Sequence, residues 1–218
     1  MVGDAFRQAV ATIRQVGNYR GLGRFLIGRA FYTDAANTLI FFMGIYAVQN
    51  IGYSQATTNI LLMVSVAAAI AGGLTWGPVV DRIGPKRTLD LVLLSWGITL
   101  VSAAVIPWLG LPRALFWGVA ALAGVSLGGT WCADRPYMLV LSPPSRVGEF
   151  YGLYSMVGRF AAVIGPLAWA FVAEDLGLGR EASVLVLAIM VGIAYTILRG
   201  VDDRPREWSS EELGQPAA

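Results

Sequence analysis

Two opposite charges lie within an apolar stretch near the start of the chain. Residues 28–42 read GRAFYTDAANTLIFF and place Arg29 and Asp34 among residues suited to hydrocarbon. A charge at the centre of a bilayer costs about 2.5–3.5 kcal/mol on insertion scales, so it points to pairing or function. A carboxylate there can couple a proton or a substrate, and Arg29 could bind an anionic group or pair with an acidic residue of a partner.

The spacing of these charges decides which helix faces they occupy. Arg29 and Asp34 are five residues apart, about 140° around a helix, so they are poorly placed to pair with each other. Asp34 instead shares a face with Asn37 and Thr38. We expect this face to line a cavity, with Arg159 from another apolar segment as the partner of Asp34. Three interpretations of these charged residues stay open. They could form a structural ion pair, Asp34 could couple a proton or a substrate, or the side chains could lie at the membrane rim.

Only long membrane helices can position such residues, and the composition fits a membrane protein. The 218 residues are 56% apolar and 14% charged, against roughly 25% charged in an average soluble domain. The net charge of +2 gives no sign of a nucleic-acid partner. Six segments have the roughly 20 apolar residues that a span requires: 24–49, 58–80, 88–109, 113–133, 149–173 and 181–200. They predict an all-α integral membrane protein with six transmembrane helices, surrounded by membrane lipid.

The basic residues in the loops and at the ends of the spans gather on one side of the predicted membrane. That side would receive twelve: Arg7, Arg14, Arg20, Arg24, Arg82, Lys86, Arg87, Arg135, Arg146, Arg199, Arg204 and Arg206. The other side would receive only Arg113 and Arg180. The positive-inside rule then predicts a multi-pass protein with both termini cytoplasmic. We expect the membrane to be a bacterial inner membrane.

Two further segments flank the predicted transmembrane domain of residues 24–200. In residues 1–23, apolar side chains recur at helical spacing, which predicts an amphipathic segment on the cytoplasmic membrane surface; a frayed polar leader is the alternative. Residues 201–218 are polar and predict a disordered cytoplasmic tail.

The loop between the second and third predicted spans reads GPVVDRIGPKR, residues 77–87. Gly77 would let two helices approach closely, and Gly84 would permit the tight reversal. Asp81 can accept hydrogen bonds from an arginine, while Arg82 would help to hold the loop on the cytoplasmic side. Without its context, the stretch could also be an ordinary basic loop.

This loop resembles the G-x-x-x-D-R-x-G-[RK]-[RK] signature of the major facilitator superfamily, with departures at Val80 and Pro85. Three longer stretches resemble the C-terminal half of the vacuole-effluxer-like permeases: FLIGRAFYTDAANTLIFFMGIYA, EFYGLYSMVGRFAAVIGPL and GGTWCADRPYMLVLSPPSRVGEFYG. The last of these departs from that family by carrying Asp134 and Pro136 around Arg135.

The resemblance implies a six-helix half of a major facilitator superfamily fold, with its first and fourth helices lining the central cavity. It implies a secondary transporter, or its C-terminal half, moving a small polar solute by alternating access. Amino acids are the first candidate solute and a proton gradient a candidate driving force. At the cytoplasmic gate, Asp81 and Arg135 could form a latch between the second and fourth helices.

Half of such a fold needs a complement, because its polar face would strand charges in lipid. The partner would be a second copy in a homodimer or a separate N-terminal half, unless the chain is a truncated product. A membrane scaffold or sensor subunit that does not transport is the rival function. The sequence carries no HExxH, G-x-S-x-G or Cys-x-x-Cys motif, so we expect neither an enzyme nor a cofactor or metal. In the fifth span, Gly158, Gly165 and Pro166 suit close packing and a bend.

Overall fold

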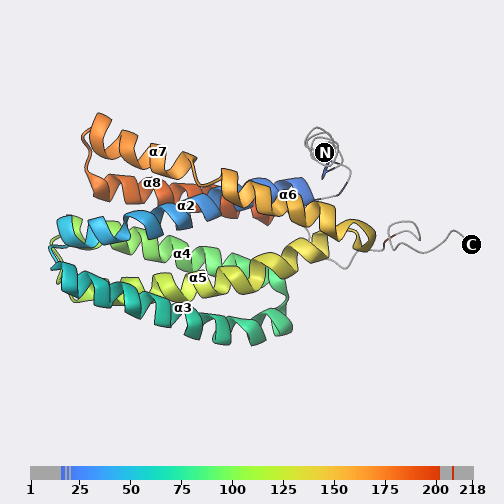
Figure 1. The fold of residues 1–218 in the computed structure, drawn as a ribbon, viewed down its shortest axis with the longest axis horizontal. Coiled ribbons are helices and arrows are strands. Elements are labelled where there is room, and N and C mark those ends of the chain that lie inside the picture. The colour runs from blue at the N-terminus through green and yellow to red at the C-terminus, as the bar shows by residue number, and fades with distance from the viewer. Residues whose placement is uncertain (1–15, 18, 20, 202–207, 209–218) are drawn as a thin grey trace, which may run out of the picture.

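A computed structural model describes residues 16, 17, 19, 21–201 and 208, and the chain folds there into a bundle of helices (Figure 1). The long helices are α2 (Leu22–Gln49), α3 (Gln55–Ile83), α4 (Pro85–Trp108), α5 (Leu115–Leu141), α6 (Val147–Phe160) and α8 (Arg180–Arg199). Three shorter elements complete the order: the 3-10 turn η1 (Pro144–Arg146), α7 (Ile164–Ala170) and the π-helical turn η2 (Phe171–Asp175). The predicted surface segment 1–23 and the predicted tail 201–218 lie mostly outside the described residues.

The helices have the length and composition of a membrane bundle. Five helical segments of the described chain can cross a membrane on these grounds: α3, α4, α5, the stretch Pro144–Asp175 and α8. Helix α2 has 28 residues, enough for a span, but it carries Arg29, Asp34 and Asn37. Fourteen of its 28 residues are buried, so neighbouring helices shield much of it from lipid. The predicted all-α membrane fold is confirmed, with α2 as the polar inner member.

The order in which the helices pack shows an internal relationship between the first three and the last three segments. Helix α3 lies along α5, α4 packs against both α5 and α8, and α2 packs against α8 and more lightly against α6 and α7. Exchanging α2 with α5, α3 with α6 and α7, and α4 with α8 turns the α3–α5 and α4–α5 pairs into the α2–α6/α7 and α2–α8 pairs and leaves the α4–α8 pair unchanged. This is the pattern of two three-helix repeats.

Small residues allow α3 and α5 to touch backbone to backbone. A Cβ added to Gly72 would lie 2.8 Å from the Val125 Cα atom, and one added to Gly128 would lie 2.6 Å from the Gly73 nitrogen. Such contacts replace the hydrophobic drive that is missing between helices in lipid. Gly77 was predicted to serve this purpose, but a Cβ added there would meet no atom of the described residues. The close approach falls at Gly72, more than a helical turn earlier.

A single residue joins α3 to α4. Gly84 has φ +86°, a conformation that favours glycine, and its N–H bonds the Val80 carbonyl oxygen at 2.9 Å. Pro85 is the first residue of α4, where its missing N–H costs nothing. The predicted tight reversal at Gly84 is confirmed, and Pro85 has a structural use where the superfamily signature has a basic residue.

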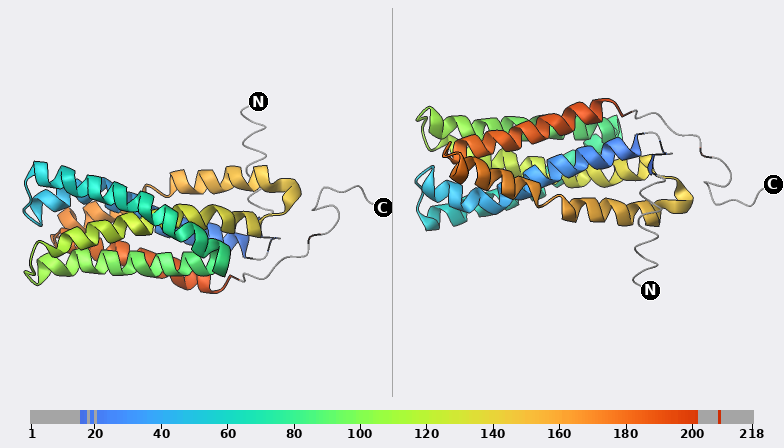
Figure 2. Two further views of the ribbon diagram at one scale, coloured as in Figure 1. Left: turned by 90° about the horizontal axis from the view of Figure 1, so that it is seen from below. Right: turned by 90° about the horizontal axis from the view of Figure 1, so that it is seen from above.

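The fifth predicted span is not one continuous helix over 149–173. It is broken between Phe160 and Ile164, so α6 lies along the outside of the bundle while α7 packs on α8 (Figure 2). Pro166 explains the break, because it has no N–H and its ring clashes with the carbonyl group four residues earlier. The expected bend is therefore present, as a break in the helix rather than a gradual curve.

Candidate functional site

A buried ion pair joins α2 to α5. The Arg29 Nε atom donates to the Asp134 Oδ2 atom at 3.1 Å, and the two residues are 8% and 5% exposed. Arg29 lies seven residues after Leu22 at the start of α2, and Asp134 lies seven residues before Leu141 at the end of α5. The two helices run in opposite directions, so these equal offsets place the two charges at the same depth.

Two tyrosine hydroxyl groups complete the cluster around Asp134. The Tyr32 hydroxyl donates to the Asp134 Oδ1 atom, and the Tyr154 hydroxyl donates to the Oδ2 atom at 2.6 Å. Arg29 also donates to the Tyr154 carbonyl oxygen at 3.1 Å, with its guanidinium carbon 3.6 Å from the centre of the Tyr154 ring. The cluster thus ties α6 to α2 and α5, with one cation and two hydroxyls around one carboxylate.

The close approach of α6 to this cluster depends on a missing side chain. A Cβ added to Gly158 would lie 2.5 Å from the Arg29 Nη1 atom. The predicted role of Gly158 in close helix packing is confirmed. Arg29 was expected to bind an anion or an acidic residue of a partner; its carboxylate is instead Asp134 of the same chain.

Asp34 has a different task from the one predicted. Its Oδ2 atom accepts a hydrogen bond from the Gly165 N–H at 2.7 Å, and Thr38 lies 3.5 Å from its Oδ1 atom. Gly165 is in the first turn of α7, where backbone N–H groups have no partner within their own helix. The predicted Asp34–Arg159 pair is wrong for this structure, because the break before α7 offers Asp34 a backbone donor while Arg159 is exposed on α6.

A cavity of about 320 Å³ opens beside the ion pair, between α2, α5 and α6. Four predicted site residues line it: Arg29, Asn37, Arg135 and Arg159. Asp34 and Thr38 do not, since both are buried toward α7. On α2 the lining residues are Arg29, Thr33, Ala36 and Asn37. Their spacing of four, three and one residues puts them on one face of α2. The predicted face consisted of Asp34, Asn37 and Thr38, and of these three only Asn37 lines the cavity.

The predicted gate residues remain apart in this conformation. Asp81 and Arg82 are exposed near the end of α3, and no ion pair among the described residues joins Asp81 to Arg135. Arg135 lines the cavity instead. The latch is therefore not formed here, because Asp81 is on the exposed side of its helix end.

Sequence reasoning missed the centre of the cluster. Asp134 stood out only as a departure from the family pattern, and Tyr154 carried no signal. The matching offsets of Arg29 and Asp134 from the ends of two oppositely directed helices could have indicated the pair.

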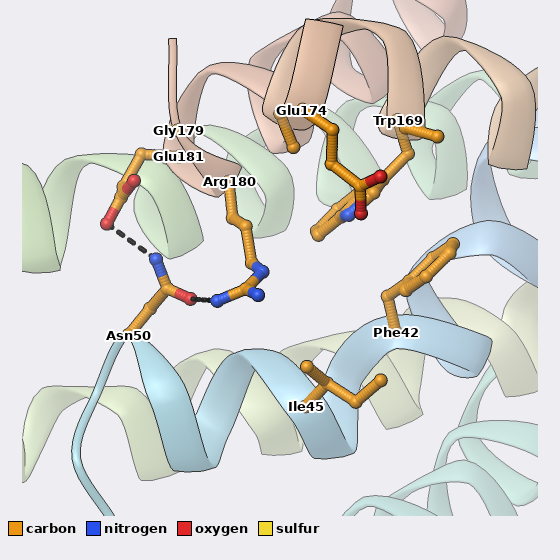
Figure 3. Close-up of a pocket in the computed structure, with 10 residues that line it drawn as sticks. Phe42, Ile45, Asn50, Trp169, Glu174, Gly179, Arg180 and Glu181 are labelled. Carbon is orange, nitrogen blue, oxygen red and sulfur yellow. Dashed lines mark hydrogen bonds between the residues drawn. The ribbon is translucent and has the colours of Figure 1, made fainter. Parts of the chain in front are cut away.

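A second cavity, of about 380 Å³, lies where the end of α2 meets the end of α7, η2 and the start of α8 (Figure 3). The Phe42 and Trp169 rings stack there with centroids 4.8 Å apart. Asn50 donates to Glu181 at 2.8 Å and accepts from Arg180 at 3.4 Å. These contacts fasten the start of α8 to the end of α2, so the polar groups of Asn50 and Glu181 serve the structure.

A membrane bundle whose helix contacts repeat in two groups of three, with a buried ion pair beside a cavity, fits one half of a fold of the major facilitator type. The chain belongs to the family described as vacuole effluxer Atg22 like, whose model matches residues 1–206. The suspected family is thereby confirmed.

Several relatives carry the names of transporters. The chain is 29% identical over 208 residues to the uncharacterized MFS-type transporter YxiO of Bacillus subtilis (strain 168), covering 95% of this chain and 46% of that protein. It is 20% identical over 205 residues to autophagy-related protein 22 of Pichia angusta, covering 90% and 36%. It is 26% identical over 170 residues to a Na(+), Li(+), K(+)/H(+) antiporter of Planococcus maritimus, covering 77% and 39%.

The chain thus spans less than half the length of these relatives. Two of these names, an MFS-type transporter and an antiporter, and the description of the family as effluxer-like are those of transporters rather than enzymes, in line with the prediction from the sequence.

Proposed function

We propose that this chain forms one half of a secondary transporter that moves a small polar solute across a membrane by alternating access. The main observation that supports this proposal is the cavity between α2, α5 and α6, which is bordered by the Arg29–Asp134 pair. Ionised residues are expensive inside a membrane and mark solute or proton pathways there. The family and the names of the relatives support the same class of function.

The proposal includes a second half that covers this cavity. The two least buried spans are α3 and the Pro144–Asp175 segment, each with 17% of its most apolar window buried, against 50% for α4 and α5. These two segments exchange places under the internal repeat. A complementary half, either a second copy or a separate N-terminal half, would cover both and close the cavity.

Proton coupling is part of the proposal, with Asp134 as its carboxylate. Asp34 and Asp134 are the buried carboxylates of the described chain, and only Asp134 borders the cavity, whereas Asp34 caps α7. A proton on Asp134 would weaken its pair with Arg29 and the hydrogen bond that it accepts from Tyr154, and would so loosen the contacts of α5 with α2 and α6. In this proposal the solute site and the position of α6 then change together.

The test is uptake into proteoliposomes that contain the full chain and any complementary half that copurifies with it. A panel of amino acids, small organic acids and monovalent cations is offered with and without a proton gradient. We expect saturable uptake of at least one solute, and accumulation only with the gradient. Absence of flux for every solute would contradict the proposal and favour a scaffold or sensor subunit that does not transport.

A further inference from the structure

The charges around the cavity do not balance. Three arginines line it, Arg29, Arg135 and Arg159, together with one carboxylate, Asp134. Arg29 and Asp134 pair at 3.1 Å and cancel. Arg135 and Arg159 form no ion pair with any described carboxylate. The wall that this chain contributes therefore carries an excess of two positive charges.

The position of Arg159 argues against a guanidinium that faces lipid. It lies 15 residues after Pro144 and 16 residues before Asp175, within a helical stretch long and apolar enough to cross a membrane. A guanidinium inside the hydrocarbon is costly, and a site that faces water or a partner avoids that cost. Arg159 lines the cavity, which is such a site.

The remaining polar groups of the cavity are neutral. Asn37, Thr33, Tyr151 and Ser155 offer hydroxyl and amide groups along α2 and α6. The carboxylate of Asp134 is already surrounded by Arg29, Tyr32 and Tyr154. An ammonium group of a solute would find no free carboxylate on this wall, whereas a carboxylate would find a guanidinium that can bind it through two parallel hydrogen bonds.

We infer that the cavity binds small organic anions through a carboxylate held by Arg159, with Arg135 adding to the positive field. The inference rests on the proposed transport function for its place in the membrane, but binding can be measured without transport. A cavity of about 320 Å³ on one half has room for a solute of a few carbon atoms. A net anion is preferred over a zwitterion of the same size.

Three nearly isosteric probes separate charge from shape: L-lactate is an anion, L-alanine a zwitterion and lactamide neutral. The full chain in lipid nanodiscs is titrated with each, and with inorganic phosphate, while tryptophan fluorescence is recorded. Trp131 lines the cavity, so Trp131→Phe identifies the part of the signal that comes from this site. We expect saturable lactate binding, alanine weaker by about tenfold, and no binding of lactamide.

Substitutions assign the binding to the arginine. Arg159→Gln is expected to weaken lactate binding by about tenfold or more, because a charged hydrogen-bond partner is lost. Arg159→Lys keeps the charge and should retain part of the affinity. Arg199→Gln removes the same charge from an exposed position outside the cavity and should bind lactate as the parent does. Arg159 is exposed, so its replacement should leave the thermal unfolding midpoint unchanged.

The inference is overturned if alanine or lactamide binds as tightly as lactate, if Arg159→Gln matches the parent, or if no probe binds. Phosphate binding as tight as lactate binding would overturn the assignment to a carboxylate. Lactate binding without lactate flux in proteoliposomes would support this inference and count against the transport function. Flux of neutral or cationic solutes that does not depend on Arg159 would do the reverse.

Discussion

Asp34 and Asp134 are both buried carboxylates, yet they have different partners. Asp134 faces a guanidinium and two hydroxyl groups, so its interactions are largely between charges and strong dipoles. Asp34 accepts a backbone N–H from the start of α7. An amide oxygen can replace a carboxylate in the second role but not in the first, because an amide cannot neutralise Arg29.

This difference predicts unequal effects of one substitution at two sites. Asp134→Asn should lower the free energy of unfolding by about 3–5 kcal/mol, because it leaves Arg29 buried without a counter-charge. It should also abolish gradient-driven accumulation in proteoliposomes. Asp34→Asn keeps an acceptor for the Gly165 N–H and should cost about 1 kcal/mol. Unfolding in detergent, followed by tryptophan fluorescence, measures both.

A double substitution is the control for the pair. Arg29→Gln combined with Asp134→Asn removes both charges and should be more stable than Asp134→Asn alone. Equal losses for the two single asparagine variants, or no recovery in the double variant, would contradict an ionic role for Asp134.

At the scale of elements, two different devices hold the bundle together. Helices α3 and α5 meet along glycines, where backbone atoms of the two helices pack directly. The broken fifth segment is held by polar clamps: the Asp134 cluster fastens α6, and Asp34 fastens α7. The break lies between these clamps, after Phe160 and before Ile164, so each part of the segment has its own polar attachment.

The glycine contact predicts a strong dependence on side-chain size at one position of α5. Gly128→Leu would force a side chain into the backbone of α3 at Gly73 and should separate the two helices. We expect loss of the folded chain during size-exclusion chromatography, or a large fall in the unfolding midpoint. Gly118→Leu is the matched control on the same helix, because its Cβ meets open space. Similar behaviour of both variants would contradict the packing argument.

At the scale of the whole molecule, the bundle has one well-packed side and one open side. The open side carries α3 and α6, and α3 exposes large apolar residues including Met63, Ile70 and Leu74. The cavity lies beside α6, and its Arg135 and Arg159 form no ion pair with a carboxylate of the described residues. A face that exposes guanidinium groups beside apolar helices suits a protein partner better than lipid alone.

This arrangement predicts that the chain associates through its open side in a lipid bilayer. Single cysteines at Met63 or Leu74, in a Cys132→Ser background, should form crosslinks to a second chain. A cysteine at Ile189 on α8, which is 62% exposed outside this face, should not. Mass measurement in nanodiscs then distinguishes a homodimer from a pair with a separate half. Detection of monomers only, without crosslinks, would contradict the prediction.

The sequence by itself determined the class of fold, because the length and apolar composition of the helices depend on local composition. It also identified Gly84 as a turn and Gly158, Gly165 and Pro166 as sites of packing and bending, since these follow from backbone chemistry. Only the tertiary structure decided the pairing of the charges. Arg29 pairs with Asp134, which is 105 residues away in the sequence. The rotation of α2 about its axis turns Asp34 toward α7, while Thr33 and Asn37 face the cavity. Such choices depend on helix rotation and on the exact place where the fifth segment breaks, which composition and periodicity do not specify.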